Sequence, residues 1–155
     1  MYNSYNSYDG YDSGMAIGAI IGIIVLAVII GLIPVIFYLL NLQNTLKAVR
    51  PQNQKMPPGQ VWLMFIPLFN IVWNFIMVQR IAESIKAEYD SRQVPCEDKP
   101  AYSIGLAMCI CNCCGWIPIL NMLAGLGGIV LWIVYWVKTA EYKRNMQAMQ
   151  ASSPM

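Results

Sequence analysis

The chain contains no histidine, and only 12% of its 155 residues are charged. The missing histidine removes the commonest general base and the commonest metal ligand in proteins. The low charge argues against a soluble domain, in which roughly 25% of residues are charged. The net charge of +2 is small and the basic residues do not form one stripe, so we expect no nucleic-acid partner.

Patterns that mark most catalytic sites are missing as well. There is no Ser/His/Asp set, no Gly-x-Gly-x-x-Gly motif and no phosphate-binding loop. Acidic and basic residues are absent from residues 13–46, 56–79 and 100–137, whereas proton relays and ion-coupled transporters usually need such groups at membrane depth. We therefore expect neither an enzyme nor an active transporter, and no cofactor.

Long apolar runs dominate the sequence instead. It is 57% hydrophobic, and each charge-free run reaches the roughly 20 residues that a helix needs to cross a bilayer. These features predict an all-α integral membrane protein with a long N-terminal spanning helix over residues 15–40. No Lys or Arg precedes this helix, and it exceeds the apolar length of a secretory signal, so we interpret it as a retained span.

The predicted organisation is one helical membrane domain between two tails. Residues 1–14 place a tyrosine at every third position from Tyr2 to Tyr11, among Asn, Ser, Asp and Gly. Such a composition cannot pack a core and predicts a disordered tail. Residues 15–146 form the expected membrane domain, and residues 147–155 a flexible C-terminal tail.

Small residues recur at helical spacing in two of the apolar runs. Gly14, Gly18 and Gly22 fall on one helix face, and Ala124 with Gly128 repeats the spacing. In lipid, such faces let another helix approach closely. That helix could belong to the same chain or to a second copy, so we expect the partners to be the lipid bilayer and either further copies or other membrane proteins.

A five-residue element occurs twice. Residues 66–70 read Ile-Pro-Leu-Phe-Asn, and residues 117–121 read Ile-Pro-Ile-Leu-Asn. In each copy the proline removes a backbone donor within an apolar run, and the asparagine can bond the opened backbone. We predict two helix–bend–helix units and interpret them as an internal repeat, with chance similarity as the alternative. The predicted bend and polar membrane residues are Pro67, Asn70, Asn74, Pro118 and Asn121.

All ten basic residues lie in residues 47–55, 80–99 and 138–144. The positive-inside rule places these segments in the cytoplasm and the tyrosine-rich tail outside. A simple four-span arrangement cannot put all three on one side, so we favour re-entry of residues 61–78, which would turn at the first bend. Three or four plain spans that break the rule are the alternative. Either way we expect a multi-pass protein of the cell membrane with a cytoplasmic C-terminus.

Four closely spaced cysteines are the only cluster with metal-type ligands. In a helix, Cys109 and Cys113 share one face, and Cys111 and Cys114 share another. Four thiolates could hold Cu(I) or zinc, but the spacing is not that of a zinc site and apolar surroundings disfavour the thiolate. We interpret these cysteines as packing residues; a metal or redox role and acylation near the interface are the alternatives.

Part of the sequence is more particular than its composition requires. Residues 58–63 read Pro-Gly-Gln-Val-Trp-Leu, the first Ile-Pro-x-x-Asn element follows, and residues 81–89 read Ile-Ala-Glu-Ser-Ile-Lys-Ala-Glu-Tyr. This text resembles small bacterial integral membrane proteins of unknown function that carry Ile-Pro-x-x-Asn elements. The resemblance covers residues 37–90, with a weaker echo at 116–143. It implies a bacterial cell membrane and a helical fold, and it supplies no activity and no functional residues.

The function predicted from these patterns is that of a non-enzymatic membrane scaffold or assembly partner that associates with itself. One alternative is a passive channel or small-solute facilitator lined by Asn70, Asn74, Asn112 and Asn121, although asparagines in such places more often bond across helices. The other alternative is a metal or redox protein built on the cysteine cluster.

Overall fold

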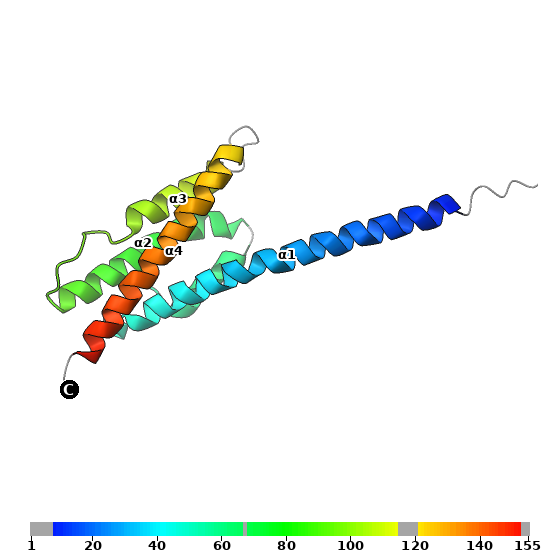
Figure 1. Cartoon of the computed structure of the whole chain (residues 1–155). Helices are drawn as coiled ribbons and strands as arrows, with labels where there is room; N and C mark the ends of the chain where they lie inside the picture. The colour runs from blue at the N-terminus through cyan, green and yellow to red at the C-terminus, as the bar shows by residue number, and fades with distance from the viewer. Residues whose placement is uncertain (1–7, 67, 115–120, 153–155) are drawn as a thin grey trace, which may run out of the picture. The chain divides into compact units, whose positions relative to one another are not determined.

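The computed structural model describes residues 8–66, 68–114 and 121–152, with side chains from Gly14 onward except for residues 121–123. Helices make up nearly all of these ranges. No strand occurs in these ranges, so the predicted all-helical class is confirmed for them. The elements, shown in Figure 1, are α1 (Tyr8–Ala48), η1 (Pro51–Asn53), η2 (Pro58–Phe65), α2 (Phe69–Ser91), α3 (Tyr102–Cys114) and α4 (Asn121–Ala151), where η marks a 3-10 helix.

The chain divides into two units, Met1–Phe37 and Tyr38–Met155. The described part of the first unit is one helical segment of α1, and its large apolar side chains are exposed along the whole length. Among the described residues, Gly14–Ala48 is the one helix that is long and apolar enough to cross a membrane, judged by length and composition. This is the N-terminal helix that the apolar run predicted.

Both terminal helices extend into segments that were expected to be tails. Helix α1 begins at Tyr8, within the expected N-terminal tail, and α4 continues to Ala151 within the expected C-terminal tail. The physical reason is that adding a residue to an existing helix fixes one residue for one hydrogen bond, so a helix propagates into polar sequence at low cost. Residues 1–7 and 153–155 lie outside the described residues.

The second unit packs α2, α3, α4 and the end of α1 around a core. Ile81, Ile85 and Tyr89 follow one another at helical spacing on α2, and all three are buried. Their periodicity predicts one apolar face of a helix, and the structure packs this face against protein. Other large side chains of this core are Tyr38, Leu39, Leu42, Leu46, Met77, Met108, Tyr135 and Met146.

A polar seam joins the end of α1 to α4 inside this core. The amide of Asn41 donates to Thr139 Oγ1 over 3.1 Å, and Lys143 Nζ donates to Asn41 Oδ1 over 3.0 Å. Thr45 donates to the carbonyl of Thr139 over 3.4 Å, and Gln150 donates to a carbonyl at the end of α1 over 2.8 Å. Buried polar groups that find partners in this way fix the register between two helices.

Three helices meet at Gly105 of α3. A Cβ atom at this position would clash with Val78 Cγ1 of α2 and would lie 2.8 Å from Tyr135 Cε2 of α4. Glycine is therefore the side chain that lets α2 and α4 close on α3. In the sequence, Gly105 is an isolated glycine inside an apolar helix, and such a glycine often has a packing reason. It is not among the predicted helix-packing residues.

The two ends of the second unit differ in polarity. The charged residues of this unit lie in segments 47–55, 80–99 and 138–144. The Arg50–Glu88 ion pair joins the first two segments. Lys99 and Lys138 line the same surface pocket, which brings the second and third segments together. We call this the charged end. Between Met77 and Cys109 the chain exposes no large apolar side chain.

The opposite end, where α2 begins and α3 finishes, is apolar outside. We call it the apolar end, and with the first part of α4 it carries nearly all the large exposed apolar side chains of the second unit. These are Phe65, Ile66, Leu68, Phe69, Ile71, Val72, Ile76, Ile110, Leu126, Ile129, Val130, Ile133, Val134 and Val137.

Candidate functional site

A helix start positions two asparagines at the apolar end. Helix α2 begins at Phe69, and the backbone N–H of Asn70 donates to the carbonyl of Ile66 over 3.0 Å. The ring of Phe69 stacks on Trp73, whose indole N–H donates to the carbonyl of Gln60 in η2 over 3.1 Å. These contacts fix the first turn of α2. Asn70 and Asn74 then fall four residues apart, on one face of the helix.

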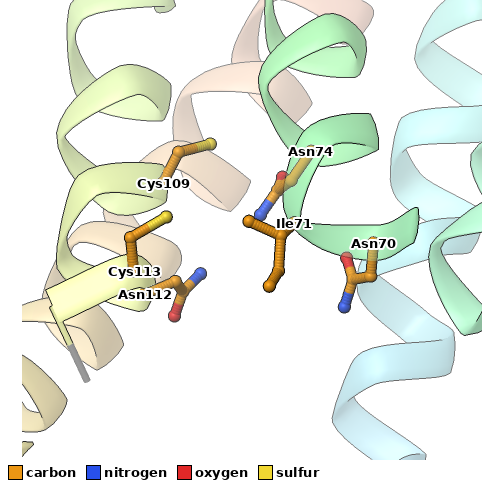
Figure 2. A pocket seen from close by; sticks show the side chains of 6 residues that line it. All are labelled: Asn70, Ile71, Asn74, Cys109, Asn112 and Cys113. Atoms are coloured by element: carbon orange, nitrogen blue, oxygen red, sulfur yellow. The ribbon is translucent and has the colours of Figure 1, made fainter. Parts of the chain in front are cut away.

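The facing surface comes from the last turns of α3. Cys109, Asn112 and Cys113 are spaced by three and four residues, so they also share a helix face. Figure 2 shows their side chains pointing from α3 toward α2, where Ile71 and Asn74 face them. The i, i+4 spacing of the two cysteines predicted their shared face, whereas their meeting with the asparagines of α2 arises from tertiary packing.

These two faces enclose a cavity of about 250 Å³. That is room for several water molecules, each of which occupies about 30 Å³ in the liquid. Asn70, Asn112 and Cys113 are exposed at its mouth, while Asn74 and Cys109 are buried, with exposed fractions of 8% and 1%. Of the described residues that line it, Ile71 is the one with a hydrocarbon side chain. The cavity therefore has a polar interior at the end of the unit whose outer surface is apolar.

One lining atom lacks a hydrogen-bond partner. Asn74 Oδ1 is buried and accepts no hydrogen bond from the residues that the structure describes. Leaving a buried acceptor unpaired costs about 1–3 kcal/mol, and this oxygen is itself closed to the cavity because it has almost no accessible surface. None of the six lining side chains carries a formal charge, and the site can therefore bind by hydrogen bonding but has no built-in charge to complement an ion.

The cysteine cluster is divided between two faces of α3. Cys109 and Cys113 line the cavity toward α2, whereas the Cβ atom of Cys111 lies against Gly128 of α4, 3.6 Å from where a Cβ would stand. Cys114 is half-buried. Within the described residues, no group of three or more His, Cys, Asp or Glu side chains is placed to hold a metal ion.

The predicted helix-packing residues fall in different surroundings. Gly128 is buried against α3, and Ala124 is half-buried one turn earlier. In the first unit, Gly14, Gly18 and Gly22 are exposed, and a Cβ at any of them would meet nothing within 4 Å. Gly128 thus lies in the contact between α3 and α4, while the first glycine face meets none of the described residues.

Both predicted bends lie partly outside the described residues. Pro67 and Pro118 lie outside the described residues. Helix η2 finishes at Phe65 and α2 begins at Phe69, around the first element. Asn121, at the end of the second element, is the first residue of α4, and its side chain is also outside the described part.

A buried carboxylate at the charged end was not singled out by sequence reasoning. Glu88 is fully buried, and Asn53 Nδ2 and the backbone N–H of Arg50 donate to its Oε2 over 2.7 and 3.1 Å. Arg92 Nε donates to Oε1 over 2.8 Å, and Arg50 Nε lies 3.3 Å from the same oxygen. Burial alone would raise the pKa of Glu88, but the hydrogen bonds from Asn53, Arg92 and the backbone of Arg50 outweigh it and hold this pKa below its ordinary value.

This carboxylate ties η1 to the end of α2. Its partners come from η1, from the residue before η1 and from the residue after α2, and both of its oxygens accept hydrogen bonds. A fully satisfied buried carboxylate of this kind fixes local geometry. Local sequence does not single out Glu88, because its partners at positions 50 and 53 are remote in the chain.

Comparison with protein-family profiles, with curated proteins and with solved structures finds no match to this chain. The site is therefore interpreted from its own residues.

Proposed function

We propose that the protein is a non-enzymatic membrane scaffold that is anchored by the N-terminal helix and assembles through it. The observation that carries this proposal is the first unit itself: a long helix, apolar on every side, with a face of three glycines that a second helix can approach. A segment of this composition is costly to leave in water, at roughly 25 cal/mol per Å² of exposed apolar surface. The bilayer removes that cost, and the glycine face provides the packing surface.

The second unit is proposed to insert its apolar end into one leaflet. The apolar start of α2, residues 69–78, has a length of about 15 Å as a helix, against roughly 30 Å for the hydrocarbon core. It is too short to cross, yet its exposed Val72 and the exposed Leu68 just before it favour lipid. The charged end would then remain in the headgroup layer and the cytoplasm, which agrees with the positive-inside rule. This is the re-entrant arrangement, with the N-terminal tail outside and the C-terminus inside.

Self-association is tested by fluorescence energy transfer between differently labelled full-length chains in liposomes. Gly18→Leu combined with Gly22→Leu should abolish transfer above the level of random collisions, because two leucines keep the helices apart. Gly31→Leu is the matched control, since Gly31 lies nine residues, or about two and a half turns, beyond Gly22 and so on the opposite face. Undiminished transfer in the double variant would refute assembly through this face.

Orientation is tested at a native cysteine. Cys96 lies half-exposed in the segment between α2 and α3, at the charged end. In inverted bacterial membrane vesicles, where the cytoplasmic face is outside, a membrane-impermeant maleimide should modify Cys96, and in intact spheroplasts it should not. Modification in spheroplasts alone would place the charged end outside and overturn the proposed topology.

A further inference from the structure

We infer that a pocket at the charged end binds the zwitterionic phosphoethanolamine group, in which a phosphate and an ammonium group are joined by a short carbon link. The pocket runs along α2, between the segment that joins η1 to η2 and the segment that precedes α3. It belongs wholly to the second unit. Three features carry the inference: charges of both signs, two lysines without a carboxylate partner, and a position where the exposed apolar surface of α2 stops.

The pocket is small, open and charged. It encloses about 270 Å³, which is room for several water molecules of about 30 Å³ each or for one small polar group. Six of the ten described residues that line it are ionised, three lysines and three acids: Lys55, Lys86, Lys99, Glu83, Asp90 and Asp98. A solute with charge of one sign would meet like charges here, whereas a zwitterion can meet an opposite charge at each end.

Two of the three lysines are not neutralised by an acid of the described chain. Lys86 Nζ lies 2.9 Å from Asp90 Oδ1 and 4.0 Å from Asp98 Oδ1, so this lysine is paired. The ion pairs within the described part of the chain leave Lys55 and Lys99 without a carboxylate. Both ammonium groups can therefore donate to a phosphate, which accepts charge-assisted hydrogen bonds.

These two lysines are held at different walls of the pocket. The backbone N–H of Lys55 donates to Ser84 Oγ of α2 over 2.9 Å, and Ser84 is fully buried. Lys99 Nζ lies 5.0 Å from the centroid of the Tyr102 ring, a cation–π contact at the start of α3. A phosphate between the two walls would accept from both lysines.

The acids of the pocket provide a place for the ammonium end. Asp90 and Asp98 share the single positive charge of Lys86, which leaves negative charge over. The side chain of Asp98 is fully exposed and that of Asp90 is more than half exposed, so both can accept from a ligand. Glu83 differs, because it lies 3.7 Å from Arg80 Nη1, outside the lining. Surplus charge of both signs therefore remains in one pocket.

The pocket begins where the exposed apolar surface of α2 stops. Ile76 is the last residue of α2 with a large exposed apolar side chain. Gln79 is the first α2 residue of the lining, three residues or about 4.5 Å further along the helix. With the apolar end in one leaflet, this is the depth of the lipid headgroups. A lipid source for the ligand rests on the proposed function, whereas the charge pattern does not, and a soluble phosphoethanolamine ester is the other source.

Native mass spectrometry of the full-length protein in dodecyl maltoside micelles tests the pocket, because this detergent carries neither charge nor phosphate. The probes are phosphatidylethanolamine, phosphatidylglycerol and phosphatidylcholine with identical acyl chains, and free O-phosphoethanolamine. Phosphatidylglycerol has the phosphate without an amine, and phosphatidylcholine has methyl groups in place of the N–H donors. Phosphatidylethanolamine should bind about five-fold more tightly than either, the upper range for one exposed ion pair.

Substitutions separate the two ends of the ligand. Lys55→Gln combined with Lys99→Gln should weaken binding of all three lipids by about five-fold or more, since each carries a phosphate. Lys47→Gln changes an exposed lysine outside the lining and should have no such effect. Asp98→Asn should remove the preference for phosphatidylethanolamine. Glu97→Gln is its matched control, because Glu97 is the exposed neighbour of Asp98 but does not line this pocket.

Equal binding of the three lipids together with no binding of free O-phosphoethanolamine would overturn the inference. A preference that survives Asp98→Asn, or affinities unchanged in the double lysine variant, would also overturn it. Binding of free O-phosphoethanolamine that follows the same variants, without a preference among the lipids, would support the pocket and assign it to a soluble ester.

The comparison of headgroups uses the wild-type protein, so it decides the question even where a variant fails to fold. The measurement needs neither self-association nor a bilayer. Its failure is therefore distinct from a failure of the proposed function, which would appear as undiminished energy transfer in the glycine variants or as reversed labelling of Cys96.

Discussion

Gly105 provides the sharpest prediction about the packing of the second unit. Gly105→Ala adds one methyl group to α3 at the point where α2 and α4 both approach. That methyl would clash with Val78 Cγ1 and lie 2.8 Å from Tyr135 Cε2. Neither neighbour can withdraw easily, because Val78 is a stiff β-branched side chain and the ring of Tyr135 is buried.

Two opposing effects set the size of the change. Alanine in place of a helical glycine stabilises a helix by about 1 kcal/mol. Overpacking a well-packed core costs about 1–3 kcal/mol, and a clash with two different helices places Gly105 at the upper part of that range. We therefore expect Gly105→Ala to lower the free energy of unfolding by about 2 kcal/mol net.

The measurement is reversible unfolding in detergent micelles, followed by far-UV circular dichroism. Gly128→Ala is the matched control. It makes the same change at a helix contact, but the added Cβ would lie at an ordinary 3.6 Å from Cys111 Cβ. This variant should be as stable as wild type or more stable by up to about 1 kcal/mol.

A double-mutant cycle identifies the cause. Val78→Ala removes both methyl groups that crowd Gly105, so in this background the cost of Gly105→Ala should fall by at least about 1 kcal/mol. A Gly105→Ala variant as stable as wild type would refute the close approach of the three helices. A penalty unchanged by Val78→Ala would show that the clash with α2 is not its source.

Two further predictions concern the charged end, both read out by the same unfolding assay. Glu88→Gln should lower the free energy of unfolding by about 3 kcal/mol, since it leaves buried donors facing an amide. Because folding lowers the pKa of Glu88, the stabilisation by its carboxylate is full above the unfolded pKa of about 4.3 and is lost as pH falls through the folded pKa. The stability of wild type should therefore fall in acid more than that of Glu88→Gln, and parallel pH profiles would contradict this. Gln93 lies two residues after the end of α2 and has a φ of 56°, and the N–H of Val94 donates to the carbonyl of Tyr89 over 3.1 Å. Gln93→Gly should therefore raise the free energy of unfolding by about 1 kcal/mol and Gln93→Ala should not change it, and equal effects of the two would contradict a left-handed cap.

The elements that local sequence could predict are those that local physics determines. The apolar run of residues 15–40 predicts a long helix by composition alone, and the spacing of Ile81, Ile85 and Tyr89 predicts one apolar face of α2, which the structure buries. Each inference needs only neighbours within a few turns of the same helix.

The parts that could not be predicted depend on residues far apart in the chain. Glu88 looks like any solvent-facing acid of an amphipathic helix until Arg50 and Asn53 are placed beside it. The asparagines of α2 and the cysteines of α3 each define a helix face by their spacing, but that these two faces enclose one cavity follows only from how α3 packs on α2.

The cluster of aromatic rings between α1 and α4 gives the second unit an optical signature. The ring of Tyr38 lies 5.3 Å from that of Trp132 and 6.1 Å from that of Trp136, and the two indoles are 5.4 Å apart. Transition dipoles this close and held at fixed angles couple and produce a strong near-UV circular dichroism signal, which vanishes when tertiary packing is lost while helices persist. The attachment of α1 to α4 can therefore be followed by light alone, without adding a label.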